Sequence, residues 1–227
     1  MKIGTHNAKD YGAKQLTAEF QLPQTGSSYE WPDDFLEPID LPTTQKCGSV
    51  KVVILFKGRS RNEIMRNISD FCGLLDGPQK VELDGYQGWY LGRLQKSTVA
   101  KTVSGTAYKL TIELDGYMVG EEEVVEATQG LPITRKGSRR RPCTVEITTP
   151  EDAQLVTLRG FAKEIAVKNL TAGVTVTISA DGLVLENGNN KMQDVEMQAF
   201  PILEEETTLT WEPAAAAVVV RYIPAWM

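Results

Sequence analysis

Residues that could carry out catalysis are sparse in this chain of 227 residues. A nucleophilic serine or cysteine works with a neighbouring histidine as its base, and the sequence contains a single histidine, His6, in a polar N-terminal segment. It contains neither a GxSxG motif nor a glycine-rich phosphate-binding motif. We therefore expect no catalytic residues, no bound cofactor and no enzymatic activity.

Carboxylates and amides offer two other chemistries. A glycosidase needs two carboxylates across a cleft, and Asp33-Asp34 and the acidic residues 121–123 are candidates. Adjacent acids on a strand point to opposite faces, which favours solvated surface instead. Oxygen ligands of the kind that calcium prefers occur at Asp181, Asn187, Asn189 and Asn190. Asp-Gly and Asn-Gly turns account for the same residues, so we expect no metal site.

The three cysteines, Cys47, Cys72 and Cys143, lie far apart and form no CxxC motif. A Cys/His metal site needs several such ligands together, and one histidine with three scattered cysteines nearly excludes it. An odd number of cysteines in this arrangement indicates free thiols and a reducing compartment. Cys72 falls on an apolar helical pattern, which favours a buried thiol.

Four aromatic residues could stack on a sugar ring, namely Tyr86, Trp89, Tyr90 and Trp211. At the period of a strand, Trp89 and Leu91 share one face while Tyr90 and Gly92 share the other. A tryptophan that alternates with a leucine is typical of a core strand, so we predict that Trp89 is packed. A saccharide site remains the alternative.

Composition narrows the class of protein. The net charge of −6 disfavours a nucleic-acid binder, which needs a basic face. No apolar run approaches the roughly 18 residues of a membrane span, and the N-terminus has no apolar segment of a secretory signal. We expect no nucleic-acid and no membrane partner.

The elements that position these residues are mostly strands, with one helix. Residues 49–57 (SVKVVILFK) are rich in β-branched side chains and predict a strand buried on both faces around Ile54. Ser60 with Glu63 three residues later is a capping box, and apolar spacings of three and four then predict a helix over residues 61–75. Further strands are predicted at residues 16–22, 80–83, 89–95 and 108–114, with hairpin turns at Asp84-Gly85 and Ser104-Gly105.

Residues 23–48 form a long segment with four prolines between two of these strands. A loop of this length in a compact domain is usually functional or an arm. Its apolar Trp31, Phe35 and Leu36 indicate that it packs onto something.

The second half of the chain is a series of short strands. A basic run at residues 135–142 separates it from the first half, as a linker or as a grip for an acidic partner. About eight strand patterns follow from Cys143, with turns at Asp181-Gly182 and Asn187-Gly188, which predicts a β-sandwich or jelly roll. We therefore predict a domain of residues 1–136 and a domain of residues 137–227. The apolar run at residues 218–227 must be packed, and it favours a strand over a helix.

The order of elements resembles the distal tail protein (Dit) family of long-tailed phages and prophages over most of the chain. Residues 4–12 (GTHNAKDYG) are similar to its opening polar turn, and residues 49–94 to its central strand, helix and aromatic hairpin. Residues 200–211 (FPILEEETTLTW) and 218–227 (VVVRYIPAWM) are similar to its small sandwich and its tyrosine–proline–aromatic ending. Two departures are Ala225, where the family commonly has a basic residue, and the acidic residues 204–206, where it tends to have a glycine turn.

The resemblance implies a mainly β protein: an N-terminal β-sandwich-like domain with one helix, then a galectin-like β-sandwich. It implies a structural protein whose N-terminal domains form a hexameric ring, joining the tail tube protein to the tail-tip or baseplate hub. The expected location is the virion tail tip, after assembly in the bacterial host cytoplasm. Trp31, Phe35 and Leu36 are then candidates for the contact between subunits. The alternative is a carbohydrate-binding module of a host-adhesion device.

Overall fold

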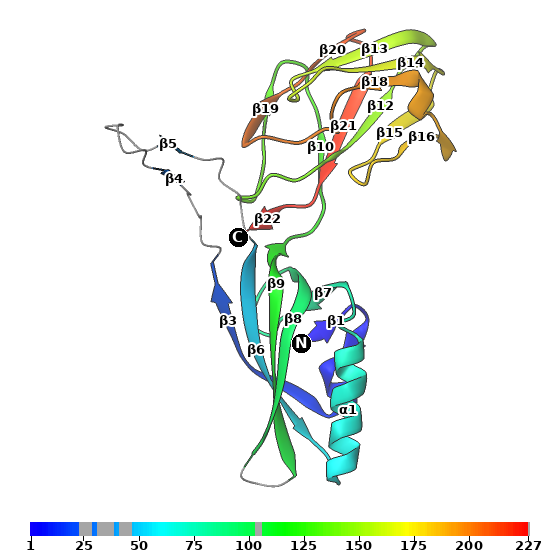
Figure 1. Ribbon diagram of the computed structural model, residues 1–227. Helices are drawn as coiled ribbons and strands as arrows, with labels where there is room; N and C mark the ends of the chain where they lie inside the picture. The colour runs from blue at the N-terminus through cyan, green and yellow to red at the C-terminus, as the bar shows by residue number, and fades with distance from the viewer. Residues whose placement is uncertain (23–28, 31–38, 41–46, 103–105, 227) are drawn as a thin grey trace. The chain divides into compact units, whose positions relative to one another are not determined.

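The computed structural model describes residues 1–22, 29–30, 39–40, 47–102 and 106–226. The chain forms two compact units, residues 1–119 and residues 120–226 (Figure 1). The predicted boundary after residue 136 is therefore wrong by 17 residues. The strand β10 (Glu123–Glu126) pairs with β21 (Ala217–Tyr222), and β11 (Pro132–Thr134) pairs with β19 (Glu206–Thr208). Both β10 and β11 therefore belong to the second unit.

The first unit is built on one antiparallel sheet. Its strands follow the order β2-β1-β7-β8-β9-β6-β3. Their bounds are β1 (Lys2–Ile3), β2 (His6–Asn7), β3 (Ala13–Gln21), β6 (Gly48–Lys57), β7 (Pro78–Glu82), β8 (Trp89–Lys101) and β9 (Ala107–Val119), with a 3-10 helix η1 at Ala8–Tyr11. The predicted mainly β architecture is confirmed, and the strands are longer than their sequence patterns.

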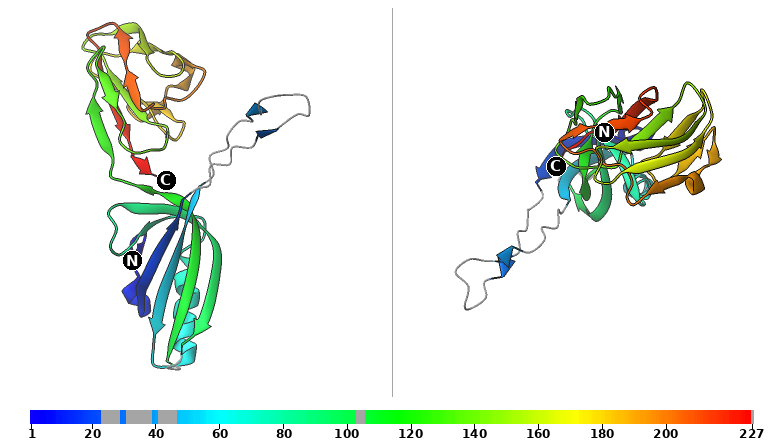
Figure 2. Two further views of the ribbon diagram at one scale, coloured as in Figure 1. Left: turned by 90° about the vertical axis from the view of Figure 1, so that its left-hand side faces the viewer. Right: turned by 90° about the horizontal axis from the view of Figure 1, so that it is seen from above.

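The helix α1 (Arg61–Gly73) lies along one face of this sheet, behind its strands in Figure 2, left. The Ser60 hydroxyl accepts a hydrogen bond from the Glu63 backbone N–H at 3.2 Å, as the capping signal predicts. The Glu63 carboxylate accepts from the backbone N–H of Arg59 at 2.8 Å, one residue before the position expected for a capping box.

Alternation along β6 decides which face of the sheet is the core. Val50, Val52, Ile54 and Phe56 are fully buried, and Phe56 meets Phe71 of α1 edge-on with 5.5 Å between ring centroids. Val53 and Leu55, on the other face, are only half-buried. The prediction of a strand buried on both faces around Ile54 is therefore wrong for the second face, because α1 covers one face alone.

Some of the predictions fall outside the described residues. Trp31, Phe35 and Leu36 lie there, and so do Ser104 and Gly105. Within the long segment, β4 (Tyr29–Glu30) and β5 (Ile39–Asp40) are described and pair with each other in antiparallel fashion.

The second unit is a two-sheet β-sandwich. One sheet has the order β10-β21-β12-β15-β16-β17 and the other the order β18-β14-β13-β20. The remaining bounds are β12 (Thr144–Thr148), β13 (Ala153–Arg159), β14 (Ile165–Leu170), β15 (Thr175–Ile178), β16 (Val184–Glu186), β17 (Asn189–Asn190), η2 (Met192–Asp194), β18 (Val195–Met197), β20 (Thr210–Glu212) and β22 (Ala225–Trp226). Val218, Val220 and Tyr222 are buried in its core, so the C-terminal run is a packed strand, as predicted.

The cysteines differ in burial, which leads to a prediction. Cys47 is exposed, whereas burial raises the pKa of the Cys72 thiol and raises that of Cys143 to about 12. Because the thiolate is the nucleophile, Ellman's reagent should modify Cys47 rapidly in the native protein and Cys143 only after unfolding. The Cys47→Ser variant serves as the control and should lose the rapid phase. Rapid modification of Cys143 in the native state would contradict the burial argument.

Candidate assembly surfaces

The uncovered face of the first sheet carries a row of alternating charges. Glu19 of β3 lies opposite Lys51 of β6, Lys51 opposite Glu113 of β9, and Glu113 opposite Lys96 of β8. Opposite charges directly across neighbouring strands contribute about 0.2–1 kcal/mol per pair. The row thus ends on an acid at β3 and on a base at β8.

The same sheet has two open edges. β3 is the last strand of the order, so its outer edge has no partner strand among the described residues. β7 pairs with β8 only at residues 90–93, which leaves the outer edge of residues 94–101 without a strand in the described part of the chain. Unpaired edges are ready templates for another strand.

The two edges are matched in direction. β8, β9, β6 and β3 are neighbours in the sheet, and each neighbouring pair is antiparallel. β8 and β3 therefore run in opposite directions. The β8 edge of one copy can add to the β3 edge of another copy and continue the antiparallel order.

An apolar pocket of about 210 Å³ lies beside Leu22 and Gly48, where the long segment of residues 23–48 joins the first unit. Leu22 and Gly48, which flank residues 23–46 closely, are among its lining residues, and so are Phe20, Tyr86 and Met118. Leu22 is 73% exposed and Tyr86 45% exposed. Exposed apolar groups gathered in this way are typical of interaction surfaces.

The aromatic residues proposed for sugar stacking are mostly engaged elsewhere. Tyr90 is buried, and its hydroxyl lies 3.1 Å from the Leu114 carbonyl oxygen, to which it can donate a hydrogen bond. Trp211 is buried and its Nε1–H donates to the Ala216 carbonyl at 2.8 Å. The ring of Trp89 is half-buried under the Lys80 ammonium, 5.0 Å from the ring centroid.

The core face of β8 is the opposite of the predicted one. Tyr90 and Gly92 face the core, whereas Trp89 and Leu91 are half-buried on the other face. Gly92 is small because the Tyr90 ring lies against it: a Cβ there would come within 2.7 Å of that ring. The predicted alternation is correct, but the sequence contains no signal for the face of β8 that α1 covers.

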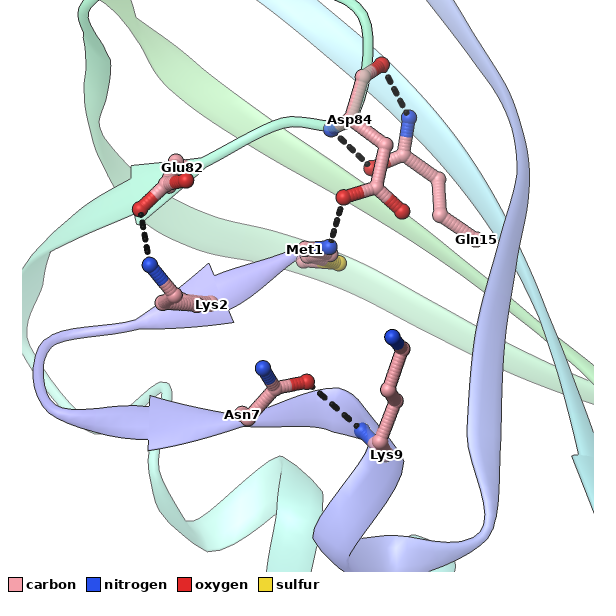
Figure 3. Close-up of polar contacts among 7 residues, drawn as sticks. All are labelled: Met1, Lys2, Asn7, Lys9, Gln15, Glu82 and Asp84. Carbon is pink, nitrogen blue, oxygen red and sulfur yellow. Dashed lines mark hydrogen bonds and ion pairs between the residues drawn. The ribbon is translucent and has the colours of Figure 1, made fainter.

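A polar cluster fastens β1 to the turn after β7 (Figure 3). The amino group of Met1 forms an ion pair with Asp84. The Gln15 side chain makes two hydrogen bonds with the Asp84 backbone: it accepts one from the N–H at 2.9 Å and donates one to the carbonyl oxygen at 3.2 Å. The Lys2 ammonium binds Glu82 at 2.9 Å. These contacts join three distant parts of the chain and hold β1 and β3 in place.

The basic run is folded onto the second unit. The Arg135 guanidinium donates to the carbonyl oxygens of Gly137 at 2.7 Å and Arg139 at 2.6 Å. Lys136 pairs with Glu123 at 2.9 Å, which raises the pKa of the lysine, and Arg140 pairs with Glu204 at 2.7 Å. The basic run is thus neither the predicted linker between domains nor a basic surface that is free to bind an acidic partner.

The candidate calcium residues form turns. Asn187 and Gly188 have φ values of 52° and 81° between β16 and β17, as a type I′ hairpin requires. The Asn190 side chain accepts from the Met192 backbone N–H at 2.9 Å. Among the described residues, no three His, Cys, Asp or Glu side chains are grouped to hold a metal ion. In the same part of the chain, no helix is long and apolar enough to cross a membrane.

Comparisons with known proteins give structural matches only. No protein-family model and no curated protein sequence matches the chain. A crystal structure of SPP1 Dit, described as a paradigm of the hub adsorption apparatus in phages that infect Gram-positive bacteria, matches with a TM-score of 0.80 at 13% identity. The match covers 100% of this chain and 98% of that chain. The chain has the Dit fold.

Two structures of the phage P2 baseplate in its activated conformation, with calcium and with strontium, also match the Dit fold of this chain. Each has a TM-score of 0.50 at 9% identity and covers 95% of this chain and 92% of that chain. The structural neighbours are thus phage hub and baseplate proteins. The resemblance predicted from the order of elements is confirmed at the level of the fold.

The two departures from the family pattern both lie in the second unit, where the structure shows their contacts. Ala225 is buried, and its backbone lies against Gly137, where an added Cβ would come within 2.5 Å of the Ala225 carbonyl oxygen. Glu204 is the partner of Arg140, and Glu206 begins β19. Glu204 therefore takes part in an exposed ion pair of the second unit, and Glu206 is an exposed residue of a paired strand.

Proposed function

We propose that this chain is a structural, non-enzymatic distal tail protein of a phage or prophage, which forms a hexameric ring between the tail tube and the tail-tip or baseplate hub. The observation that carries this proposal is the full-length match to the Dit fold at a TM-score of 0.80. The two open edges of the first sheet add a means of assembly. The partners are further copies, the tail tube protein and the hub protein.

Strand addition accounts for a ring better than for a dimer. The β8 edge and the β3 edge are different surfaces, so their pairing is heterologous, and a heterologous contact closes into a ring when the rotation between successive copies divides a full turn. Lys96 lies at the β8 end of the charge row and Glu19 at the β3 end. When two copies join at this level, the alternation of charge continues across the junction.

The long segment supplies a second contact in this proposal. Trp31, Phe35 and Leu36 are apolar residues that would bind a neighbouring copy. The apolar pocket beside Phe20 and Tyr86 is a suitable acceptor, because its surface is exposed and it lies where the segment leaves the first unit.

Within the virion, the proposed location is the tail tip, after assembly in the host cytoplasm. A role in assembly agrees with the absence of a nucleophile–histidine pair in the sequence, where His6 is the single histidine. The saccharide alternative receives no support from Tyr90 and Trp211, which are buried.

The experiment that tests this proposal is light scattering coupled to size exclusion over rising protein concentration. We expect a species of about 151 kDa, six times the chain mass of 25.1 kDa. Deletion of residues 32–38 should lower the mass of the assembly while the unfolding transition of the monomer persists. A wild-type chain that stays at 25.1 kDa at every concentration and with purified tube and hub proteins would contradict the ring.

A further inference from the structure

A groove of about 700 Å³ opens at the start of β13 in the second unit. It is lined by the loop of residues 149–152, by the first half of β13 and by residues 212–215. The proposed ring contacts involve the first unit, so this groove is available for a separate purpose.

One wall of the groove is an open strand edge. β13 pairs with β14 along residues 153–158, but with β20 only along residues 157–159. On the β20 side, residues 153–156 have no partner strand among the described residues. Because backbone groups point alternately to the two sides of a strand, every second residue of this stretch directs its N–H and C=O into the groove.

The groove also exposes an apolar side chain and holds an unpaired hydroxyl. Leu155 lines it and is 47% exposed. Thr149 lines it, is 1% exposed, and its Oγ1 has no hydrogen-bond partner among the residues that the structure describes. A buried hydroxyl without a partner is unfavourable, and a bound polar group that reaches it would relieve that cost.

The charge of the groove is negative. Glu151, Asp152 and Glu212 line it, and none of its described lining residues is a lysine, arginine or histidine. Asp152 also accepts a hydrogen bond from the Ala172 backbone N–H at 2.8 Å, which fixes the loop. Arg159, ion-paired with Glu164, is close enough to Glu212 to interact with it. The unbalanced charge is therefore at the Glu151 end.

We propose that this groove binds a short, extended, cationic peptide segment of a partner protein. The segment adds to residues 153–156 as a strand that continues the line of β20, which is how edge strands recognise extended peptides. Its lysine or arginine side chains face Glu151, and a small apolar side chain rests on Leu155. The backbone provides the affinity and the carboxylates select the charge.

The test uses the full chain, immobilised, against a displayed library of random eight-residue peptides. We expect enrichment of peptides that alternate β-branched residues with lysine or arginine. Titration calorimetry then compares the best peptide with two altered forms, one with N-methylated backbone amides and one with glutamate in place of lysine or arginine. We expect both altered forms to bind with about tenfold or more lower affinity than the best peptide. Enrichment of no peptide would overturn the proposal, and so would equal binding of the N-methylated form.

Protein variants locate the binding. Glu151→Lys and Leu155→Lys should each lower the affinity for the selected peptide about tenfold or more. The control is Leu183→Lys, at a residue that is 53% exposed in the same unit, and this variant should bind the peptide with unchanged affinity. Equal effects of all three would place the peptide elsewhere and overturn the proposal. Binding of a neutral oligosaccharide in its place, lost in Leu155→Lys, would assign a lectin groove and overturn it as well.

Thr149→Val separates binding from folding. Removing an unpaired buried hydroxyl while keeping the shape of the side chain should leave the thermal midpoint equal or higher. The same change should lower the affinity for the selected peptide, because the peptide loses its hydrogen bond with the Thr149 hydroxyl. Unchanged binding of the peptide by this variant would overturn the proposed contact at Thr149. Oligomeric mass is measured independently, so failure here leaves the ring proposal standing.

Discussion

Val99→Lys is expected to reduce the assembly from about 151 kDa to monomers of 25.1 kDa. Val99 lies on the open edge of β8 and is 40% exposed, and its partner across β9 is Leu110. A lysine on an edge strand prevents another strand from pairing there, because its charge would have to be desolvated. Since Val99 is exposed, the monomer should tolerate the change, and light scattering measures the effect.

The matched control is Val124→Lys. Val124 is 50% exposed in β10 of the second unit, so the substitution has the same chemistry at similar exposure in the unit that does not contain the β8 and β3 edges. We expect the ring to persist in this variant. If both variants assemble like the wild type, the β8 edge takes no part in assembly; if both fall apart, the added charge itself is responsible.

Gly116→Ala is expected to destabilise the first unit by about 3 kcal/mol, at the upper end of the cost of overpacking. Gly116 of β9 lies opposite Gly92 of β8. A Cβ on Gly116 would lie 2.1 Å from the Leu91 carbonyl oxygen and 2.7 Å from the Gly92 Cα. These are backbone atoms that cannot rotate away, so the two strands would have to separate. Urea unfolding followed by tryptophan fluorescence measures the loss.

Gly73→Ala is the control for this prediction. Gly73 is the last residue of α1, and a Cβ there meets nothing within 4 Å. Alanine favours the helix by about 0.5–1 kcal/mol relative to glycine, so this variant should be as stable as the wild type or slightly more stable. Similar losses in the two variants would mean that the contact at Gly116 is not the cause.

Much of the fold could be predicted from local signals. The β-branched run in residues 49–57 indicated β6, the Ser60 cap indicated the start of α1, and Asn187-Gly188 indicated a tight hairpin turn. Each of these depends on neighbours within a few residues, whose backbone preferences and hydrogen bonds act before any tertiary contact forms. The sequence order of these elements was enough to indicate the Dit fold.

The candidate surfaces could be predicted less well, because they depend on which strands pair. Nothing local distinguishes the open residues 94–101 of β8 from its paired residues 90–93, since the difference is the length of β7. The groove at residues 153–156 likewise exists because β20 is shorter than β13. An edge is a property of a sheet, and no strand carries it alone.

The sequence by itself determined the class of fold, the period of each strand, the place of the helix and the scarcity of catalytic groups. The tertiary structure decided which face of β8 is buried, where the first unit ends and which strand edges stay open. A period of two defines two faces but does not say which one a helix will cover. The pairing of β10 with β21 joins residues far apart in the chain, so the boundary between the units could come only from long-range contacts.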